Sequence, residues 1–253
     1  LDGYGIRYRF GLFKQYFLDG FQKETLDDWS KYGDPWSQRN ESDTVLVEFS
    51  DYKVKAVPYD MPIIGYGSKH ISNLRLWQAE PIEQFDFNLF DSGKYEKCVT
   101  DKNKAEDISR VLYPNDNTLY GKLLRLRQQY FFCSASLQDI IKKFKLKHTD
   151  FAEFPEFITI QLNDTHPVIS IPELIRLLNL EGVDFDSALE IAKGVFNYTN
   201  HTVLPEALEK WDMKFIKKIS PEIAAIITKI NAKFKKELKG ENAELLILQN
   251  GQV

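Results

Sequence analysis

The sequence predicts an α/β protein with a β-rich N-terminal part and a largely helical remainder that contains a parallel strand. Over residues 1–91, aromatic, β-branched and turn-forming residues are frequent, and short runs alternate apolar with polar side chains. Over residues 92–253, apolar residues recur with helical spacing around one short apolar run. Period-two alternation is typical of half-buried strands, and strands that alternate with helices are typical of doubly wound layers. We therefore expect two parts of one lobe, with the boundary near residue 91.

The strands are expected where the alternation is clearest. Residues 44–49 and 53–57 alternate on either side of the turn formers at 50–52, which predicts an antiparallel hairpin with one wet face. Pro58, Pro62 and Gly65 are expected to interrupt the next stretch before another strand at 72–79. Residues 157–162 are apolar and rich in β-branched residues, which indicates a buried parallel strand.

The helices are expected from apolar residues at helical spacing and from prolines at helix starts. Residues 92–112 are polar, without a core stripe, and are expected to form one projecting helix. The other expected helices cover residues 121–144, 171–180, 187–196, a segment beginning at Pro205, and residues 221–238.

The composition excludes several classes of protein. The chain has 33 Lys+Arg and 37 Asp+Glu, a formal charge of −4, and 43% hydrophobic residues. This balance argues against a disordered chain and against a nucleic-acid binder, which needs a strongly basic face. No apolar stretch reaches the length of a membrane span, and no signal peptide is visible. Two cysteines far apart make no disulfide framework and suit a reducing compartment, so a cytoplasmic protein is expected.

Three polar loops are candidates for chemistry. Asp164 and His166 follow the predicted parallel strand, where ligands bind in open α/β sheets; a capping Asp with a buried structural His is the alternative. Residues 197–202 gather hydrogen-bonding groups that suit a hydroxyl-rich ligand, or form an ordinary polar loop. Residues 115–117 form either a structural Asx turn or a ligand gate. Metal-ligand spacing, a nucleophile elbow and a phosphate loop are missing from the sequence.

Several segments, in a fixed order along the chain, resemble the glycogen and maltodextrin phosphorylase family. The longest are GYGIRYRFG at 3–11, YGDPW at 32–36, LRLW at 74–77, VLYPND at 111–116, LNDTHP at 162–167 and YTNHTVLPEALE at 198–209. Their shared order is more specific than any single motif.

The resemblance implies a two-lobed, doubly wound glycosyltransferase that cleaves a terminal glucose from an α-1,4-glucan with inorganic phosphate. It implies glucose 1-phosphate as the product, pyridoxal phosphate as the cofactor, a homodimer that packs through the polar helix, and no nucleic-acid or membrane partner. His201 would bond the glucose 6-hydroxyl, its carbonyl facing the oxocarbenium-like transition state, with Asn117 and Asp116 on a gate loop. The implied substrate-binding residues are Asp164, His166, Asn200, Glu206 and Ala207.

The resemblance also implies that the chain is a fragment of the N-terminal lobe. The family's Schiff-base lysine and its main phosphate-binding residues are expected beyond Val253, and its glycine-rich loop before Tyr4. The fragment alone is therefore expected to be inactive, and the gate departs from the animal pattern after Asn117, so regulation by nucleotide or phosphorylation is not expected. The alternatives are a non-catalytic glucan-binding or dimerisation module and, last, a metal-assisted hydrolase that uses Asp164 and His166.

Overall fold

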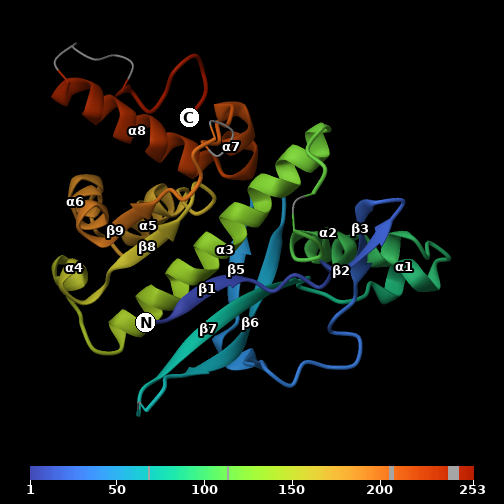
Figure 1. Cartoon of the computed structure of the whole chain (residues 1–253). Coiled ribbons are helices and arrows are strands. Elements are labelled where there is room, and N and C mark those ends of the chain that lie inside the picture. The colour runs from blue at the N-terminus through green and yellow to red at the C-terminus, as the bar shows by residue number, and fades with distance from the viewer. Residues whose placement is uncertain (68, 113, 205–207, 239–244) are drawn as a thin grey trace. The chain divides into compact units, whose positions relative to one another are not determined.

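The computed structural model describes residues 1–253 except residues 68, 113, 205–207 and 239–244 (Figure 1). The chain divides into two compact units. The first comprises Leu1–Glu48 and Tyr52–Ala135, and the second comprises Phe49–Asp51 and Ser136–Val253. The long helix α3, Leu119–Lys145, contributes to both units, as the apolar spacing over 121–144 predicted.

The first unit is built on a mixed sheet with strand order β1-β7-β6-β4, in which β5 also pairs with β6. The strands are β1 (Gly3–Ile6), β4 (Gln38–Arg39), β5 (Val45–Glu48), β6 (Lys53–Ile64) and β7 (Ile71–Glu80). The β1–β7 pair is parallel, and the other pairs are antiparallel. The predicted hairpin is confirmed, with Val45 opposite Ala56 and Val47 opposite Val54. The inward face of this hairpin is buried, as is Trp77 of β7. The apolar positions of the alternating pattern therefore lie on the core side of the sheet.

The expected break at Pro58 and Pro62 is wrong, because β6 runs through both residues to Ile64. The Pro58 carbonyl accepts a hydrogen bond from the Asn40 backbone N–H, on the β4 side of the strand. Pro58 and Pro62 are four residues apart, so both nitrogens face that side and not β7. The pairing with β5 ends at Ala56 and the pairing with β4 covers Tyr59 and Asp60, so Pro62 lies beyond both neighbouring strands, and Pro58 costs at most the one bond that its nitrogen would donate toward Asn40.

A second ribbon in the first unit was not predicted. Strands β2 (Gly11–Leu18) and β3 (Phe21–Asp27) pair antiparallel and are joined by Asp19 and Gly20. Both residues have positive φ, 52° and 81°, as a two-residue hairpin turn requires. The Asp-Gly dipeptide was the sequence signal that could have revealed this hairpin.

The single polar helix expected over residues 92–112 is also wrong. The structure has helix α1 (Phe87–Asp91), a 3₁₀ turn (Lys97–Val99) and helix α2 (Thr100–Ile108). Gly93, at φ 77°, ends α1: its N–H bonds the Phe90 carbonyl while the Lys94 N–H bonds the Leu89 carbonyl. This is a Schellman cap, which stops a helix. Helix α2 buries Ala105 and Ile108, so it has a core side that its polar composition concealed.

The second unit pairs strands β8 (Ile160–Asn163) and β9 (Phe196–Thr199) in parallel, beside several helices (Figure 1). The helices are α4 (Phe154–Phe157), α5 (Ser170–Leu180), α6 (Phe185–Val195), α7 (Met213–Ile219) and α8 (Pro221–Glu237). The helices expected at 171–180, 187–196 and 221–238 are confirmed within a few residues at their ends. Their apolar stripes form one core with the end of α3 and with Phe154.

Two expectations for this unit need correction. The strand expected over 157–162 starts only at Ile160, because Pro155 opens the short helix α4, and Gln161 and Asn163 are exposed. The helix expected from Pro205 begins on residues outside the described part of the chain, and the residues at 208–211 are not helical. Helix α7, which was not predicted, begins at Met213.

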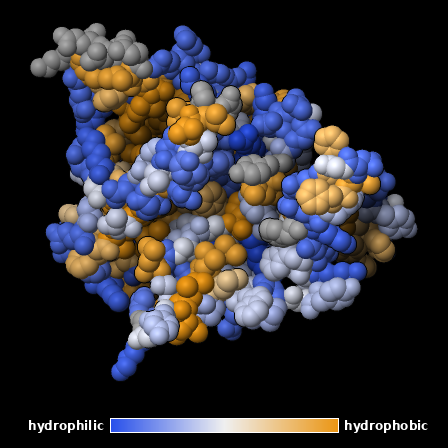
Figure 2. Space-filling model, viewed as in Figure 1, coloured by the Kyte–Doolittle hydropathy of each residue, from blue (hydrophilic) through white to orange (hydrophobic). Residues whose placement is uncertain are grey.

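The surface is mixed in polarity on the face shown (Figure 2), and both cysteines lie inside the protein. Hydrophilic and hydrophobic residues are interspersed on the face that Figure 2 shows. Cys98 and Cys133 are both buried and carry free thiols. Among the described residues, none of the helices is apolar over enough length to cross a membrane.

A partly buried ion pair between Arg75 and Asp60 in the first unit predicts acid sensitivity. Burial alone would raise the pKa of Asp60, but hydrogen bonds from Arg75, Asn73 and Asn40 outweigh it and lower that pKa to about 2. A carboxyl group whose pKa falls on folding stabilises the protein above its unfolded pKa of about 4 and ceases to do so as the pH drops toward 2. We expect the free energy of unfolding to fall by roughly 1–2 kcal/mol over that interval, after allowance for solvent screening.

Urea unfolding at pH 6, 4 and 2.5 tests this expectation. Asp60→Asn is expected to be less stable at pH 6 and to lose this part of the pH dependence. Asp101→Asn, which changes an exposed carboxylate, is the control and is expected to match the unchanged chain. Equal pH dependence in Asp60→Asn and the unchanged chain would contradict the assignment.

Candidate functional site

The carboxyl ends of β8 and β9 place Asp164 at the centre of the first candidate loop. The Asp164 backbone N–H donates to the Thr199 carbonyl at 2.9 Å, which continues the pairing of β8 with β9 by one residue. Asp164 has φ 68°, a left-handed conformation that Asp and Asn adopt more readily than most residues. Its Oδ1 accepts the Thr165 backbone N–H at 2.7 Å, which fixes the carboxylate against its own turn. This buried carboxylate is therefore held rigidly at the sheet edge.

His201 faces this carboxylate. Its Nε2 lies 3.2 Å from Asp164 Oδ2, although the two residues are 37 positions apart in the sequence. The Asp164 side chain is 13% exposed, whereas the His201 ring is 52% exposed. The pair thus has one anchored member and one member that a ligand can reach. A carboxylate that accepts from Nε2–H leaves Nδ1 as the acceptor nitrogen of a neutral imidazole.

Other predicted residues gather in the same unit. His166 Nε2 lies 3.8 Å from Glu209 Oε1, and the Glu209 side chain is only 10% exposed. Trp211 donates its indole N–H to Glu209 Oε2 at 3.3 Å. Asn200 Oδ1 accepts the Thr202 backbone N–H at 2.9 Å, an Asx turn that shapes the loop before and after His201. Glu209 was not predicted as a site residue, although it is the last residue of the YTNHTVLPEALE segment.

Asp116 and Asn117 belong to the first unit, in the loop that precedes α3. Asp116 Oδ2 forms an ion pair with Arg125 Nη1 at 2.8 Å. Asn115 Oδ1 accepts the Asn117 backbone N–H at 3.0 Å, so the predicted Asx turn is present. The Asn117 side chain itself is exposed. Of the remaining predicted residues, Glu206 and Ala207 lie outside the described part of the chain.

Together, the residues around Asp164 offer carboxylates, imidazoles and an amide, which are partners for hydroxyl groups. The described members of this set are Asp164, His166, Asn200, His201 and Glu209, and they include no lysine or arginine that could hold a phosphate. Among the described residues, three or more His, Cys, Asp or Glu side chains are nowhere arranged to hold a metal ion.

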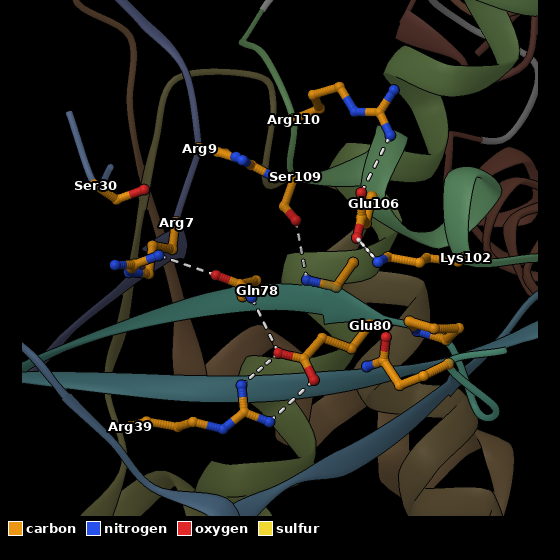
Figure 3. A pocket seen from close by; sticks show the side chains of 13 residues that line it. Arg7, Arg9, Ser30, Arg39, Gln78, Glu80, Lys102, Glu106, Ser109 and Arg110 are labelled. Atoms are coloured by element: carbon orange, nitrogen blue, oxygen red, sulfur yellow. Dashed lines mark hydrogen bonds and ion pairs between the residues drawn. The ribbon is translucent and has the colours of Figure 1, made fainter. Parts of the chain in front are cut away.

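A polar pocket in the first unit was not predicted. It has a volume of about 480 Å³ and is lined by residues that follow β1, by β4, by the end of β7 and by α2 (Figure 3). Figure 3 shows Arg7 and Ser30 on one side, with Lys102 and Glu106 opposite them. The lining holds five cationic side chains, at positions 7, 9, 39, 102 and 110, and two carboxylates, at 80 and 106. The pocket contains none of the site residues expected from the sequence.

Comparison with known proteins agrees with the resemblance. The family model described as "Carbohydrate phosphorylase" matches residues 1–249. The chain is 46% identical over 252 residues to glycogen phosphorylase, brain form, of Rattus norvegicus, covering 90% of this chain and 30% of that protein. It is 44% identical over 255 residues to the muscle form of Oryctolagus cuniculus, covering 92% of this chain and 30% of that protein. The chain thus spans about 30% of the length of these relatives. On the match over nearly its whole length, the chain belongs to the carbohydrate phosphorylase family.

Proposed function

We propose that this chain is part of the N-terminal lobe of an α-glucan phosphorylase, and that the whole protein cleaves a terminal glucose from glycogen or maltodextrin with phosphate to give glucose 1-phosphate. The observation that carries the proposal is the Asp164–His201 pair at the ends of two parallel strands. It stands in a chain that is 46% identical to a glycogen phosphorylase. The two-lobed, doubly wound fold of a glycosyltransferase is part of the same proposal, supported by the family match.

In this proposal His201 is the residue that contacts the glucosyl group. Asp164 holds Nε2–H, so Nδ1 accepts a hydrogen bond from a sugar hydroxyl, which the resemblance assigns to the 6-hydroxyl. Because Asp164 is anchored by Thr165, little side-chain freedom is lost when the sugar binds. Preorganised groups of this kind stabilise a transition state without reorganisation.

The remaining residues are proposed to shape the sugar sites. Asn117, with an exposed amide, is proposed to contact the glucose 2-hydroxyl. Asp116 is proposed to fix the position of the gate loop through its ion pair with Arg125. Asp164 and His166 are proposed to line the acceptor side of the glucan, with Glu206 and Ala207 nearby, and Asn200 is proposed to bind the substrate as well. Glu209 is added as the partner that orients His166.

Pyridoxal phosphate is proposed as the cofactor of the whole protein, where it supplies an acid/base phosphate group. The described residues around Asp164 and His201 do not fit that group, because they provide no cation for its phosphate and no lysine for its aldehyde. Its holding residues are therefore proposed to lie in other parts of the protein. A homodimer and a cytoplasmic location are proposed on the resemblance and on the two free, buried thiols.

An assay of glucose 1-phosphate release from maltodextrin and phosphate tests the function. The whole gene product, loaded with pyridoxal phosphate, is expected to turn over, and the 253-residue chain alone is expected not to. Turnover by the chain alone would overturn the fragment assignment, and no turnover by the whole product would overturn the phosphorylase assignment.

Calorimetry with maltoheptaose tests the second candidate, a non-catalytic glucan-binding or dimerisation module. The hydroxyl-binding groups around Asp164 favour it, because they need no phosphate or cofactor to bind a sugar. Glucan binding or dimerisation by a whole product that shows no turnover would support this second candidate.

A further inference from the structure

The parallel pair of strands β8 and β9 carries polar side chains that the proposed phosphorylase chemistry does not use (Figure 1). The register of the pair sets Gln161 opposite Asn197 and Asn163 opposite Thr199. These four residues are exposed, whereas Leu162, on the other face of β8, is buried. Packing therefore explains the apolar residues of these strands, and the polar ones need another explanation.

Thr199 is bonded to β8 through both its side chain and its backbone. The Gln161 amide nitrogen Nε2 donates to Thr199 Oγ1 at 2.5 Å, across the two strands. The Thr199 carbonyl accepts the Asp164 backbone N–H at 2.9 Å. Thr199 thus connects the middle of β8 with the residue that follows the end of that strand.

These bonds lie where the two strands stop pairing. Each strand is only four residues long, and Asn163 opposite Thr199 is the last pair. The ends of a short ladder open at the lowest free energy, because the last pair has a neighbour on one side only. Asp164 directly follows this pair, and His201 comes two residues after Thr199. Opening of the pair would therefore move both members of the 3.2 Å contact between Asp164 and His201.

We propose that Gln161 and Thr199 are positioning residues for His201. Their cross-strand hydrogen bond keeps the last pair of β8 and β9 closed, so that Asp164 stays within hydrogen-bonding distance of His201 Nε2. The inference rests on the proposed function, in which His201 Nδ1 accepts a sugar hydroxyl. The positioning residues do not touch the sugar in this arrangement. They act on the rate because a small displacement of a group that contacts the reacting sugar raises the barrier.

The cross-strand bond can be removed without disturbing the core of the second unit. That core packs against Ile160 and Phe196, which lie on the face of the strand pair opposite to Gln161 and Thr199. Loss of one exposed hydrogen bond leaves this apolar packing in place. The fold is therefore expected to persist while the strand ends loosen.

Thr199→Val and Gln161→Met each remove one partner of the bond at nearly constant side-chain size. Thr199→Ser keeps the hydroxyl and is expected to keep the bond. Thr228→Val is the matched control, because it removes a hydroxyl that donates to the Ala224 carbonyl at 2.8 Å on helix α8.

Nuclear magnetic resonance of the 253-residue chain gives the first readout. Above about pH 8, we expect His201 in the Nε2–H form in the unchanged chain and in a mixture with the Nδ1–H form in Thr199→Val and Gln161→Met. The Asp164 amide is expected to exchange with solvent about tenfold faster in both variants, since its bond to the Thr199 carbonyl opens with the strand ends. Thr199→Ser and Thr228→Val are expected to match the unchanged chain.

Steady-state kinetics of the whole protein give the second readout. Thr199→Val and Gln161→Met are each expected to lower kcat about tenfold and to change the KM for inorganic phosphate less than twofold, because the groups proposed to hold phosphate lie in other parts of the protein. The double variant is expected to lose no more than the more affected single variant, since both residues act through one bond.

An unchanged His201 tautomer in Thr199→Val, additive losses of kcat in the double variant, or an equal loss in Thr199→Ser would overturn the positioning role. A loss of kcat that only follows the unfolded fraction, which urea unfolding measures, would overturn it as well. No turnover by the unchanged whole protein would overturn the proposed function instead, and the tautomer would then decide the positioning role by itself.

Discussion

Asp164→Asn in the whole protein is expected to lower kcat/KM for phosphorolysis by about 10–100-fold, the loss of roughly one well-placed hydrogen bond in the transition state. Asn tolerates the left-handed φ of 68° at this position, so the turn is expected to survive. Asn Oδ1 can still accept the Thr165 N–H, which leaves the amide Nδ2 facing His201. An amide donor there favours the imidazole tautomer with Nδ1–H, so Nδ1 no longer accepts from a sugar hydroxyl.

The tautomer can be measured directly in the 253-residue chain. The chain has four histidines, so long-range ¹H–¹⁵N spectra above about pH 8, where histidines are ordinarily neutral, can be assigned by single replacements. We expect the Nε2–H form of His201 in the unchanged chain and a shift toward Nδ1–H in Asp164→Asn. Asp186→Asn, at an exposed carboxylate on α6, is the control and should change neither activity nor tautomer. An unchanged tautomer in Asp164→Asn would refute the positioning role of Asp164.

Gly121→Ala is expected to displace the loop that carries Asp116 and Asn117. A Cβ at this position would lie 1.8 Å from the Asn115 carbonyl oxygen and 2.8 Å from its carbon, so the backbone of the loop has to move. The 2.8 Å ion pair between Asp116 and Arg125 would then be broken or strained. We expect about 1–3 kcal/mol lower stability from the clash, partly offset by the better helix propensity of alanine.

The same substitution tests whether the loop works in catalysis. If Asp116 and Asn117 position the glucosyl group, the whole protein with Gly121→Ala should lose on the order of 100-fold in kcat/KM, including at temperatures where it is folded. Lys122→Ala, at the exposed neighbouring position on α3, is the control, and its stability should change by less than about 0.5 kcal/mol. Urea unfolding and steady-state kinetics on the same samples separate the two effects. Full activity in a destabilised Gly121→Ala protein would leave the loop with a structural role only.

Local patterns in the sequence determined much of this fold. The hairpin at 45–56 follows from strict alternation around turn formers, and α8 follows from one apolar stripe behind a proline at the helix start. Polar composition alone was misleading for α2, whose buried side consists of just two residues, Ala105 and Ile108. The course of β6 depended on which edge Pro58 and Pro62 face, and that edge is defined by strands far away in the sequence.

For the candidate site, the sequence determined the loops and their chemical groups, because a strand followed by polar residues is a local signal, and the order of the motifs indicated the family. Only the tertiary structure decided which groups meet. The parallel pairing of β8 and β9 brings His201 to within 3.2 Å of Asp164, and strand β7 with helix α2 and the residues after β1 encloses the charged pocket. The physical reason is that strand pairing and helix packing make neighbours of side chains that are distant in the sequence. No single segment determines which residues pair or pack against one another.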